Sequence, residues 1–140
     1  MSFESFEDAH MKLGLEGSPR YNVISSTGII SLKITDGLNS YNKVLNGGNI
    51  VWFTGIGPKS AEGIPIRNQL EEKQAPFFVS QKYGTVFPIL REKGGSVDVL
   101  GNYRIIDIIK KVTSSGFIYY HIKMYRAYDK PFFTRAKIDL

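Results

Sequence analysis

The sequence predicts a mostly β domain with one or two short helices, an α+β fold built on a curved sheet or β-barrel. Short runs rich in β-branched and aromatic residues recur along the chain, and such runs are typical of strands. Only two segments have helical character, and the chain contains no heptads and no internal repeat. Many short strands with few helices favour a barrel or a strongly curved sheet.

The length of 140 residues is that of one domain. We expect this single domain to have three parts. Residues 1–20 should hold an N-terminal helix and a connection, residues 21–127 the barrel, and residues 128–140 a tail or linker.

The N-terminal helix is expected over residues 2–13, where apolar residues recur on one side and Ser2 or Ser5 serves as the cap. A second helix is expected over residues 67–76 and should end at Pro76. The sequence 113–116, Thr-Ser-Ser-Gly, reads as a hairpin turn between the last two strands. The expected strands cover residues 21–25, 28–34, 49–54, 77–81, 85–91, 103–112 and 117–125.

Composition excludes several classes of function. With no cysteine, the chain has no disulfide framework, thiolate nucleophile or thiolate metal ligand. It has no apolar run near the roughly 20 residues of a membrane span, and its N-terminus lacks a signal pattern. We therefore expect a cytoplasmic protein without a membrane partner.

The positive charge indicates a polyanionic partner, which we expect to be DNA. The net charge is +5, and 13 of the 18 Lys and Arg residues lie from Arg67 onward. Many stand beside aromatic residues, which suits phosphate contact combined with base stacking. The candidate DNA-binding cations are Lys59, Arg67, Lys82, Arg91, Arg104, Lys123 and Arg126.

No metal site or cofactor is predicted, because His10 and His121 are far apart in the sequence and no carboxylates cluster near them. One alternative of another class stays open, a small metal-dependent nuclease. An acidic residue followed by Glu-x-Lys is a pattern of such enzymes, and Asp36, Glu71 and Lys73 form one here. That chemistry needs the Glu-x-Lys on a core strand, whereas the sequence places it in a helix.

The stretch "NIVWFTGIG" predicts a pocket for a flat ring. The apolar run ends in a glycine turn, and Tyr41 stands upstream of Phe53. If the two rings face each other, a base rotated out of a duplex fits between them, and Thr54 and Gly55 offer backbone groups to its edge. The alternative, which the pattern alone favours, is that both aromatic residues belong to the core.

Several segments, in order, resemble the SRA domain (SET- and RING-associated, also called YDG), in a divergent prokaryotic form. They are "YNKVLNGGNIVWFTGIG", "RNQL", "YGTVFPILRE", "DVLGNYRIIDI" and "IKMYRA", and together they span roughly residues 21–126. The resemblance implies a PUA-like fold and a non-enzymatic module that binds modified double-stranded DNA and flips out 5-methylcytosine or hydroxymethylcytosine. It implies that Tyr41 and Phe53 sandwich the base, that Thr54 and Gly55 bond its edge, and that Asn68 enters the duplex.

The sequence departs from the family at three places. Val44 stands where the family has an Asp that accepts from cytosine N4, Phe53 replaces a frequent Tyr, and the Tyr-Asp-Gly element becomes residues 99–101. Asn42, Asn46 or Asp36 could supply a substitute acceptor, although an amide can also present its N–H₂ group.

In bacteria such domains are typically specificity modules of modification-dependent restriction systems, so fusion to, or association with, a nuclease or NTPase domain is expected. The open alternative among binding modules is a B3-like or PUA-like barrel that binds duplex DNA or RNA without flipping.

Overall fold

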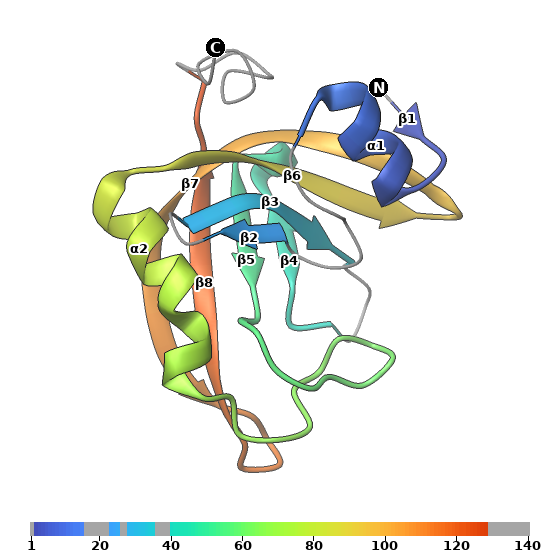
Figure 1. The fold of residues 1–140 in the computed structure, drawn as a ribbon. Coiled ribbons are helices and arrows are strands. Elements are labelled where there is room, and N and C mark those ends of the chain that lie inside the picture. The colour runs from blue at the N-terminus through green and yellow to red at the C-terminus, as the bar shows by residue number, and fades with distance from the viewer. Residues whose placement is uncertain (1, 16–22, 26–27, 36–39, 129–140) are drawn as a thin grey trace.

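The computed structural model describes residues 2–15, 23–25, 28–35 and 40–128 (Figure 1). The strands are β1 (Ser2–Phe3), β2 (Val23–Ser25), β3 (Gly28–Ile34), β4 (Lys43–Leu45), β5 (Ile50–Phe53), β6 (Val86–Lys93), β7 (Ser96–Val112) and β8 (Ile118–Arg126). The helices are α1 (Phe6–Leu13) and α2 (Ala75–Tyr83), with 3-10 turns η1 (Asn46–Gly48) and η2 (Glu71–Gln74).

The strands form one mixed sheet in the order β2-β3-β6-β7-β8-β5-β4, and β1 pairs with β7. The β3–β6 pairing is parallel, and the other pairings among the described residues are antiparallel. β2 and β4 at the two ends of this path do not pair with each other in the part of the chain described. The predicted curved sheet with few helices is confirmed, whereas a closed barrel is wrong.

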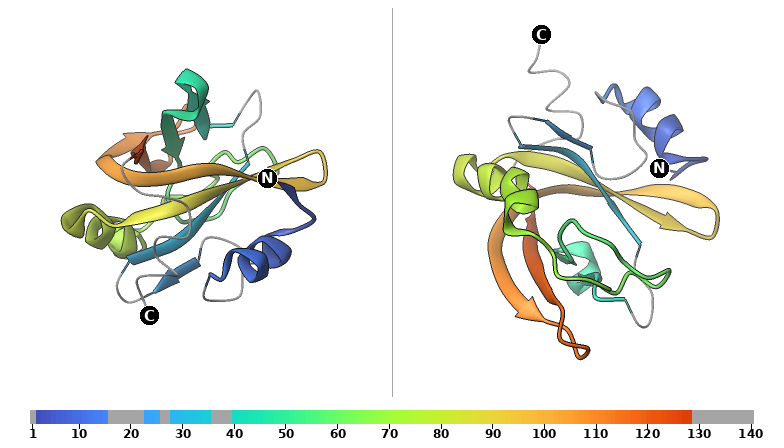
Figure 2. Two further views of the ribbon diagram at one scale, coloured as in Figure 1. Left: turned by 90° about the horizontal axis from the view of Figure 1, so that it is seen from above. Right: turned by 60° about the horizontal axis from the view of Figure 1, so that its bottom comes forward.

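The curvature comes mainly from β7. Its first half pairs with β6 and its second half with β8, so one strand passes between the two parts of the sheet (Figures 1 and 2). Register shifts at Ile89/Leu90 and Ile105/Asp107 mark irregularities in these two ladders. Such bulges increase local twist and bend the strand that carries them.

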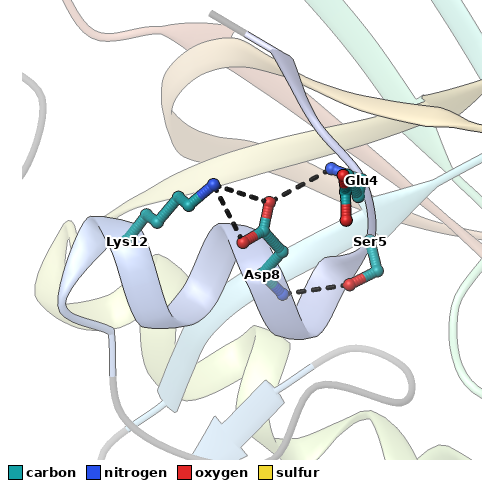
Figure 3. Close-up of polar contacts among 4 residues, drawn as sticks. All are labelled: Glu4, Ser5, Asp8 and Lys12. Atoms are coloured by element: carbon teal, nitrogen blue, oxygen red, sulfur yellow. Dashed lines mark hydrogen bonds and ion pairs between the residues drawn. The ribbon is translucent and has the colours of Figure 1, made fainter.

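Helix α1 begins at the predicted cap Ser5, whose Oγ accepts from the backbone N–H of Asp8 at 3.0 Å (Figure 3). The Asp8 carboxylate accepts in turn from the Glu4 N–H and lies 3.1 Å from the Lys12 ammonium. These contacts lower the pKa of Asp8. The apolar side of α1 packs on Leu90 and Val97 of the β6–β7 hairpin.

Helix α2 corrects two predictions, the strand over residues 77–81 and the end of a helix at Pro76. Pro76 lies instead at the start of α2, where its missing N–H costs nothing, and Gly84 ends the helix with φ +60°. Burial of Phe77 and Ser80 against the sheet selects the helix over the local β propensity.

The main core lies inside the curved sheet. It includes Leu32, Phe53, Phe77, Phe87, Tyr103 and Ile122, each at most 3% exposed. Full burial of such side chains stabilises the fold by about 1.5–3 kcal/mol each. Within the described residues, no helix has the length and apolar character needed to cross a membrane. The predicted tail, apart from Tyr128, and the candidate acceptor Asp36 lie outside the described residues.

Candidate nucleic-acid interface

The segment after β5 is held in place by two buried glutamines. Gln69 donates from Nε2 to the Thr54 carbonyl at 2.7 Å and accepts the Tyr120 N–H at 2.9 Å. Gln74 accepts the Ile56 N–H and donates to the Ile56 carbonyl, both at 2.8 Å. Each amide therefore replaces the backbone partners that a strand would supply, and together they fix residues 54–56.

Gly55 sits between these two amides with φ +52°, a conformation that favours glycine. A Cβ added there would lie 2.5 Å from Gln69 Oε1 and 2.8 Å from Gln74 Oε1. The glycine after "NIVWFT" is thus required by the close approach of two side-chain amides.

Asn42 fixes the other side of the turn. Its Oδ1 accepts from the Thr54 N–H at 3.0 Å and from the Thr54 hydroxyl at 2.9 Å. Its Nδ2 donates to the Thr35 carbonyl at 3.1 Å. Both backbone polar groups of Thr54 therefore have partners within the protein. Bonding of a base edge by Thr54 and Gly55 stays a prediction.

A cavity of about 410 Å³ opens beside these residues. Its volume lies within the range of small-ligand pockets, roughly 300–1,000 Å³. Both carboxylates and ammonium groups line it, so it can present acceptors and donors to a polar ring. The lining residues are Lys33, Thr35, Asn42, Phe53, Lys59, Ser60, Ala61, Glu62, Gly63 and Glu92.

Lys59 and Phe53 meet in this cavity. The Lys59 ammonium lies 4.4 Å from the centre of the Phe53 ring and donates to the Gly55 carbonyl at 2.6 Å. Burial lowers the pKa of Lys59 to about 8. A partly desolvated cation on an aromatic ring is a group that a ligand can displace or pair with.

Glu62 lies at the tip of a small hairpin over the cavity. Lys59 and Pro65 form a bridge, and Ser60 N–H donates to the Ile64 carbonyl at 2.8 Å. This hairpin places an exposed carboxylate on the cavity lining. Glu92 on β6 also lines the cavity, and its carboxylate lies 4.0 Å from the Lys33 ammonium.

Other predicted pocket residues lie elsewhere. The Tyr41 ring packs against Tyr119, with centroids 5.2 Å apart, and Tyr41 is not among the described residues that line the cavity. Asn46 starts the turn η1, exposed and with φ +52°. The structure therefore brings Phe53, Asn42 and Lys59 together around one cavity, and a base sandwich with Tyr41 stays a prediction.

The predicted DNA-binding cations are spread over the molecule. Lys82 is exposed on α2, Arg91 is on β6, Arg104 is on β7 and Lys123 is on β8. Arg67 and Asn68 are exposed in the segment before η2, and Asn68 Oδ1 accepts from the Ile118 N–H at 2.8 Å. Their contact with DNA stays a prediction.

Arg126 has partners inside the protein. Its Nη2 donates to the Leu100 carbonyl at 2.9 Å and to the Tyr103 hydroxyl at 3.2 Å. The Tyr103 hydroxyl in turn donates to the Gly48 carbonyl at 2.5 Å. Arg126 on β8 is thus connected to β7 and, through the Tyr103 hydroxyl, to the turn η1 before β5. These bonds stabilise the fold.

The nuclease pattern is not assembled among the described residues. Glu71 and Lys73 are exposed on the short turn η2 rather than on a core strand, and Asp36 is outside the described part. No group of three or more His, Asp or Glu side chains there could hold a metal ion. His10 is instead buried, with its Nε2 2.6 Å from the Ser31 hydroxyl.

Sequence reasoning did not find Glu62, Glu92 and Lys33 as cavity residues, or the two glutamines as supports. The sequence contains one indication of the glutamines. Both lie between the glycine-containing loop that follows β5 and the apolar helix α2. Nothing local in the sequence shows that the hairpin tip folds back over Phe53.

Comparison with known proteins identifies solved structures with a similar fold. No protein-family model and no curated protein matches the chain. Among solved structures, KRYPTONITE in complex with mCHG DNA and SAH matches 94% of the chain with a TM-score of 0.72 and 16% identity. The SUVH5 SRA complex with hemi-methylated CG DNA matches 91% with a TM-score of 0.68 and 17% identity. The modification-dependent TagI restriction endonuclease matches 92% with a TM-score of 0.70 and 17% identity.

The matched shares of the other proteins differ. The chain spans 32% of the KRYPTONITE chain and 49% of TagI, but 86% of the SUVH5 SRA chain. The match is therefore to one domain of the longer proteins. At these identities the likeness concerns the fold, and the chain has the fold of the SRA domain, as its sequence resemblance implies.

Proposed function

We propose that this chain is a DNA-binding specificity module that recognises a methylated or hydroxymethylated cytosine by flipping it into the cavity beside Phe53. The observation that carries this proposal is the cavity itself, lined by one aromatic ring and by polar groups of both kinds within an SRA fold. The solved SUVH5 SRA structures with hemi-methylated and hydroxymethylated CG DNA support it as analogies.

Phe53 would supply the stacking surface. Flipping costs a few kcal/mol in unstacking and unpairing. Stacking of a base on an aromatic ring returns about 1–3 kcal/mol. The incoming base takes the place of the Lys59 ammonium on the ring, and Lys59 is then able to turn towards a base oxygen or a phosphate.

Glu62 would supply the acceptor that Val44 cannot. A carboxylate that accepts from cytosine N4 is a standard base contact. Asn42 is engaged by Thr54, whereas the Glu62 carboxylate is exposed on the cavity lining. This role makes Glu62 the residue that distinguishes cytosine from thymine.

The test is binding to matched duplexes that differ only in the modification of one cytosine, with 2-aminopurine beside the target. We expect tighter binding to a modified duplex and a rise in probe emission as the base leaves the stack. Equal affinity for all duplexes without a rise in emission would favour a domain that binds duplex DNA without flipping a base.

We further propose that the domain is not an enzyme and acts with an associated nuclease or NTPase, as the fold match to TagI suggests. Modified and unmodified plasmids incubated with the chain and Mg²⁺ or Mn²⁺ should stay intact. If the wild type cleaves the plasmids and neither Glu71→Ala nor Lys73→Ala does, the chain is instead a metal-dependent nuclease that uses these two residues.

A further inference from the structure

A second surface lies on the opposite side of β5 from the cavity. Trp52 and Phe53 are neighbours in the strand, so their side chains point to opposite faces of the sheet. Phe53 faces the core and the cavity, while Trp52 faces outward and is half-buried. A duplex bound at the cavity therefore approaches the other face of this part of the sheet.

We call this surface the outer face. It consists of the outward side chains of β4, β5, β8 and the second half of β7, together with Tyr41. Strand register puts Lys43 opposite Trp52, Trp52 opposite Lys123, and Lys111 opposite Tyr119. Its members are Tyr41, Lys43, Trp52, Lys111, Tyr119, His121, Lys123 and Tyr125.

Aromatic rings form a continuous row on the outer face, in which Tyr119 is buried and the other rings are half-buried. Trp52 stacks on His121, with centroids 4.4 Å apart and planes inclined by 29°. His121 lies 5.6 Å from Tyr119, and Tyr119 lies 5.2 Å from Tyr41. The row therefore runs from β5 across β8 to the segment before β4.

His121 acts in this row as a neutral ring. Its Nε2 must donate to the Tyr41 carbonyl, 3.0 Å away, because a carbonyl oxygen only accepts. Its Nδ1 then accepts from the Lys111 ammonium at 3.3 Å. Burial and the nearby Lys111 charge accordingly keep the pKa of His121 low, at about 4.

Lysine ammonium groups flank the rings. Lys111 lies 5.2 Å from the Trp52 ring centre, and Lys123 lies 5.5 Å from Trp52 and 5.2 Å from Tyr125. Within the described residues, Lys43, Lys111 and Lys123 form no ion pair. Asp107, opposite Lys123, is the nearest carboxylate in the register. The outer face thus joins stacking surfaces to a net positive charge, because three lysines face one carboxylate.

We propose that the outer face binds single-stranded nucleic acid, with a base stacked on Trp52 and phosphates at Lys43, Lys111 and Lys123. Sequence-tolerant binding of single strands uses this combination of aromatic platforms and cations. In a duplex the base faces are already stacked and cannot reach Trp52. An acidic peptide would pair with the lysines, but it has no flat ring to stack on Trp52.

Trp52 is the only tryptophan of the chain, so its fluorescence reports directly on this face. Titration of the whole chain with a short oligothymidylate at low salt should quench the emission to saturation. A duplex of the same length should quench it far less. Trp52→Phe should weaken the binding of labelled oligothymidylate, measured by anisotropy, because phenylalanine offers a smaller stacking surface.

Two double variants with the same change in net charge distinguish binding at the outer face from nonspecific electrostatic attraction to the whole protein. Lys111→Ala with Lys123→Ala should lower the slope of log affinity against log salt by about 1.4, because each phosphate of a single strand that the protein neutralises adds roughly 0.7 to that slope. Lys12→Ala with Lys93→Ala should leave the slope unchanged, because neither lysine lies on the outer face. Circular dichroism checks that all variants are folded.

The proposal fails if oligothymidylate does not quench Trp52 at low salt, or if both double variants weaken binding equally. It also fails if poly-glutamate binds as tightly as the oligonucleotide, since that result points to an acidic peptide. Glu62→Gln, which tests the cavity, should leave the quenching unchanged. The two proposals therefore fail independently.

Discussion

The Lys59 ammonium lies 4.4 Å from the centre of the Phe53 ring, and both residues line the cavity beside β5. The same ammonium donates to the Gly55 carbonyl at 2.6 Å. Lys59 therefore joins the aromatic wall of the cavity to the glycine turn behind it, and entry of a base must rearrange this contact.

Replacement of Lys59 by methionine should stabilise the protein below pH 8. Burial lowers the pKa of Lys59 to about 8 from the ordinary 10.5, so the folded state holds its charged form at a cost. Between these pH values the unfolded chain binds a proton that the folded chain does not, and stability of the wild type rises with pH. The advantage of Lys59→Met should be at most about 3 kcal/mol below pH 8 and should vanish towards pH 10.5.

Urea unfolding from pH 6 to pH 10.5 measures this effect. Lys73→Met, at an exposed position on η2, is the matched control and should show no such pH dependence. If Lys59→Met keeps a constant difference from the wild type at every pH, the ammonium is not desolvated in the cavity.

Replacement of Glu62 by glutamine should reduce the preference for the target cytosine. The loss of a carboxylate acceptor for N4 is expected to cost about 1–3 kcal/mol, roughly 5- to 150-fold in affinity. The control Glu71→Gln makes the same change in charge at a site away from the cavity lining. Both variants should bind unmodified duplex slightly better, and only Glu62→Gln should accept thymine at the target position.

Competition with duplexes that carry modified cytosine, cytosine or thymine at one position gives the discrimination directly. An unchanged preference in Glu62→Gln would remove this residue from base reading, whereas loss of preference in both variants would indicate a purely electrostatic effect.

Replacement of Gly55 by alanine should destabilise the protein more than replacement of Gly94. Both glycines have similar positive φ, +52° and +59°, and each substitution costs about 1–2 kcal/mol in backbone strain. At Gly55 an added Cβ also meets the amide oxygens of Gln69 and Gln74 and the backbone carbonyl of Tyr120, whereas at Gly94 it meets nothing within 4 Å. The difference in unfolding free energy between the variants therefore measures the crowding by these three groups. Equal destabilisation would mean that the two amides and the Tyr120 backbone move aside freely.

Local pattern predicts most strands of this fold but not helix α2. The run Phe77-Phe78-Val79 has β propensity, which favours a strand there. Pro76 and Gly84 indicate a helix instead, because proline is favoured at the start of a helix and glycine at its end. The apolar contacts of Phe77 with the core, which are not visible in the sequence, settle the conformation.

The cavity was predictable only in part. Alternation along β5 places Phe53 on the inner side, so that wall follows from the sequence. The position of Glu62 does not, because the segment that carries it is held at its two ends by long-range contacts. Gln69 accepts from the Tyr120 N–H of β8, and Gln74 accepts from the Ile56 N–H. Such long-range side-chain contacts leave no periodic signal in the chain.

The last prediction concerns Tyr41, whose backbone is anchored on both sides while its ring rests on Tyr119. His121 bonds the Tyr41 carbonyl, and the neighbouring Asn42 is tied to Thr54. Its side chain can therefore rotate without moving the chain. If it closes on a flipped base, it gives up an interaction worth about 0.5–1.5 kcal/mol with Tyr119 and gains a stacking energy of about 1–3 kcal/mol.

Tyr41→Ala should then weaken binding to the preferred modified duplex by up to roughly 150-fold, and binding to unmodified duplex should change little because it depends on phosphates. Tyr125→Ala, an exposed tyrosine of the same sheet face, is the control and should keep the preference. A 2-aminopurine probe should brighten with the wild type and the control but not with Tyr41→Ala. If Tyr41→Ala is folded, keeps full preference and still brightens the probe, then Phe53 alone stacks on the base and the Tyr41 ring stays on Tyr119.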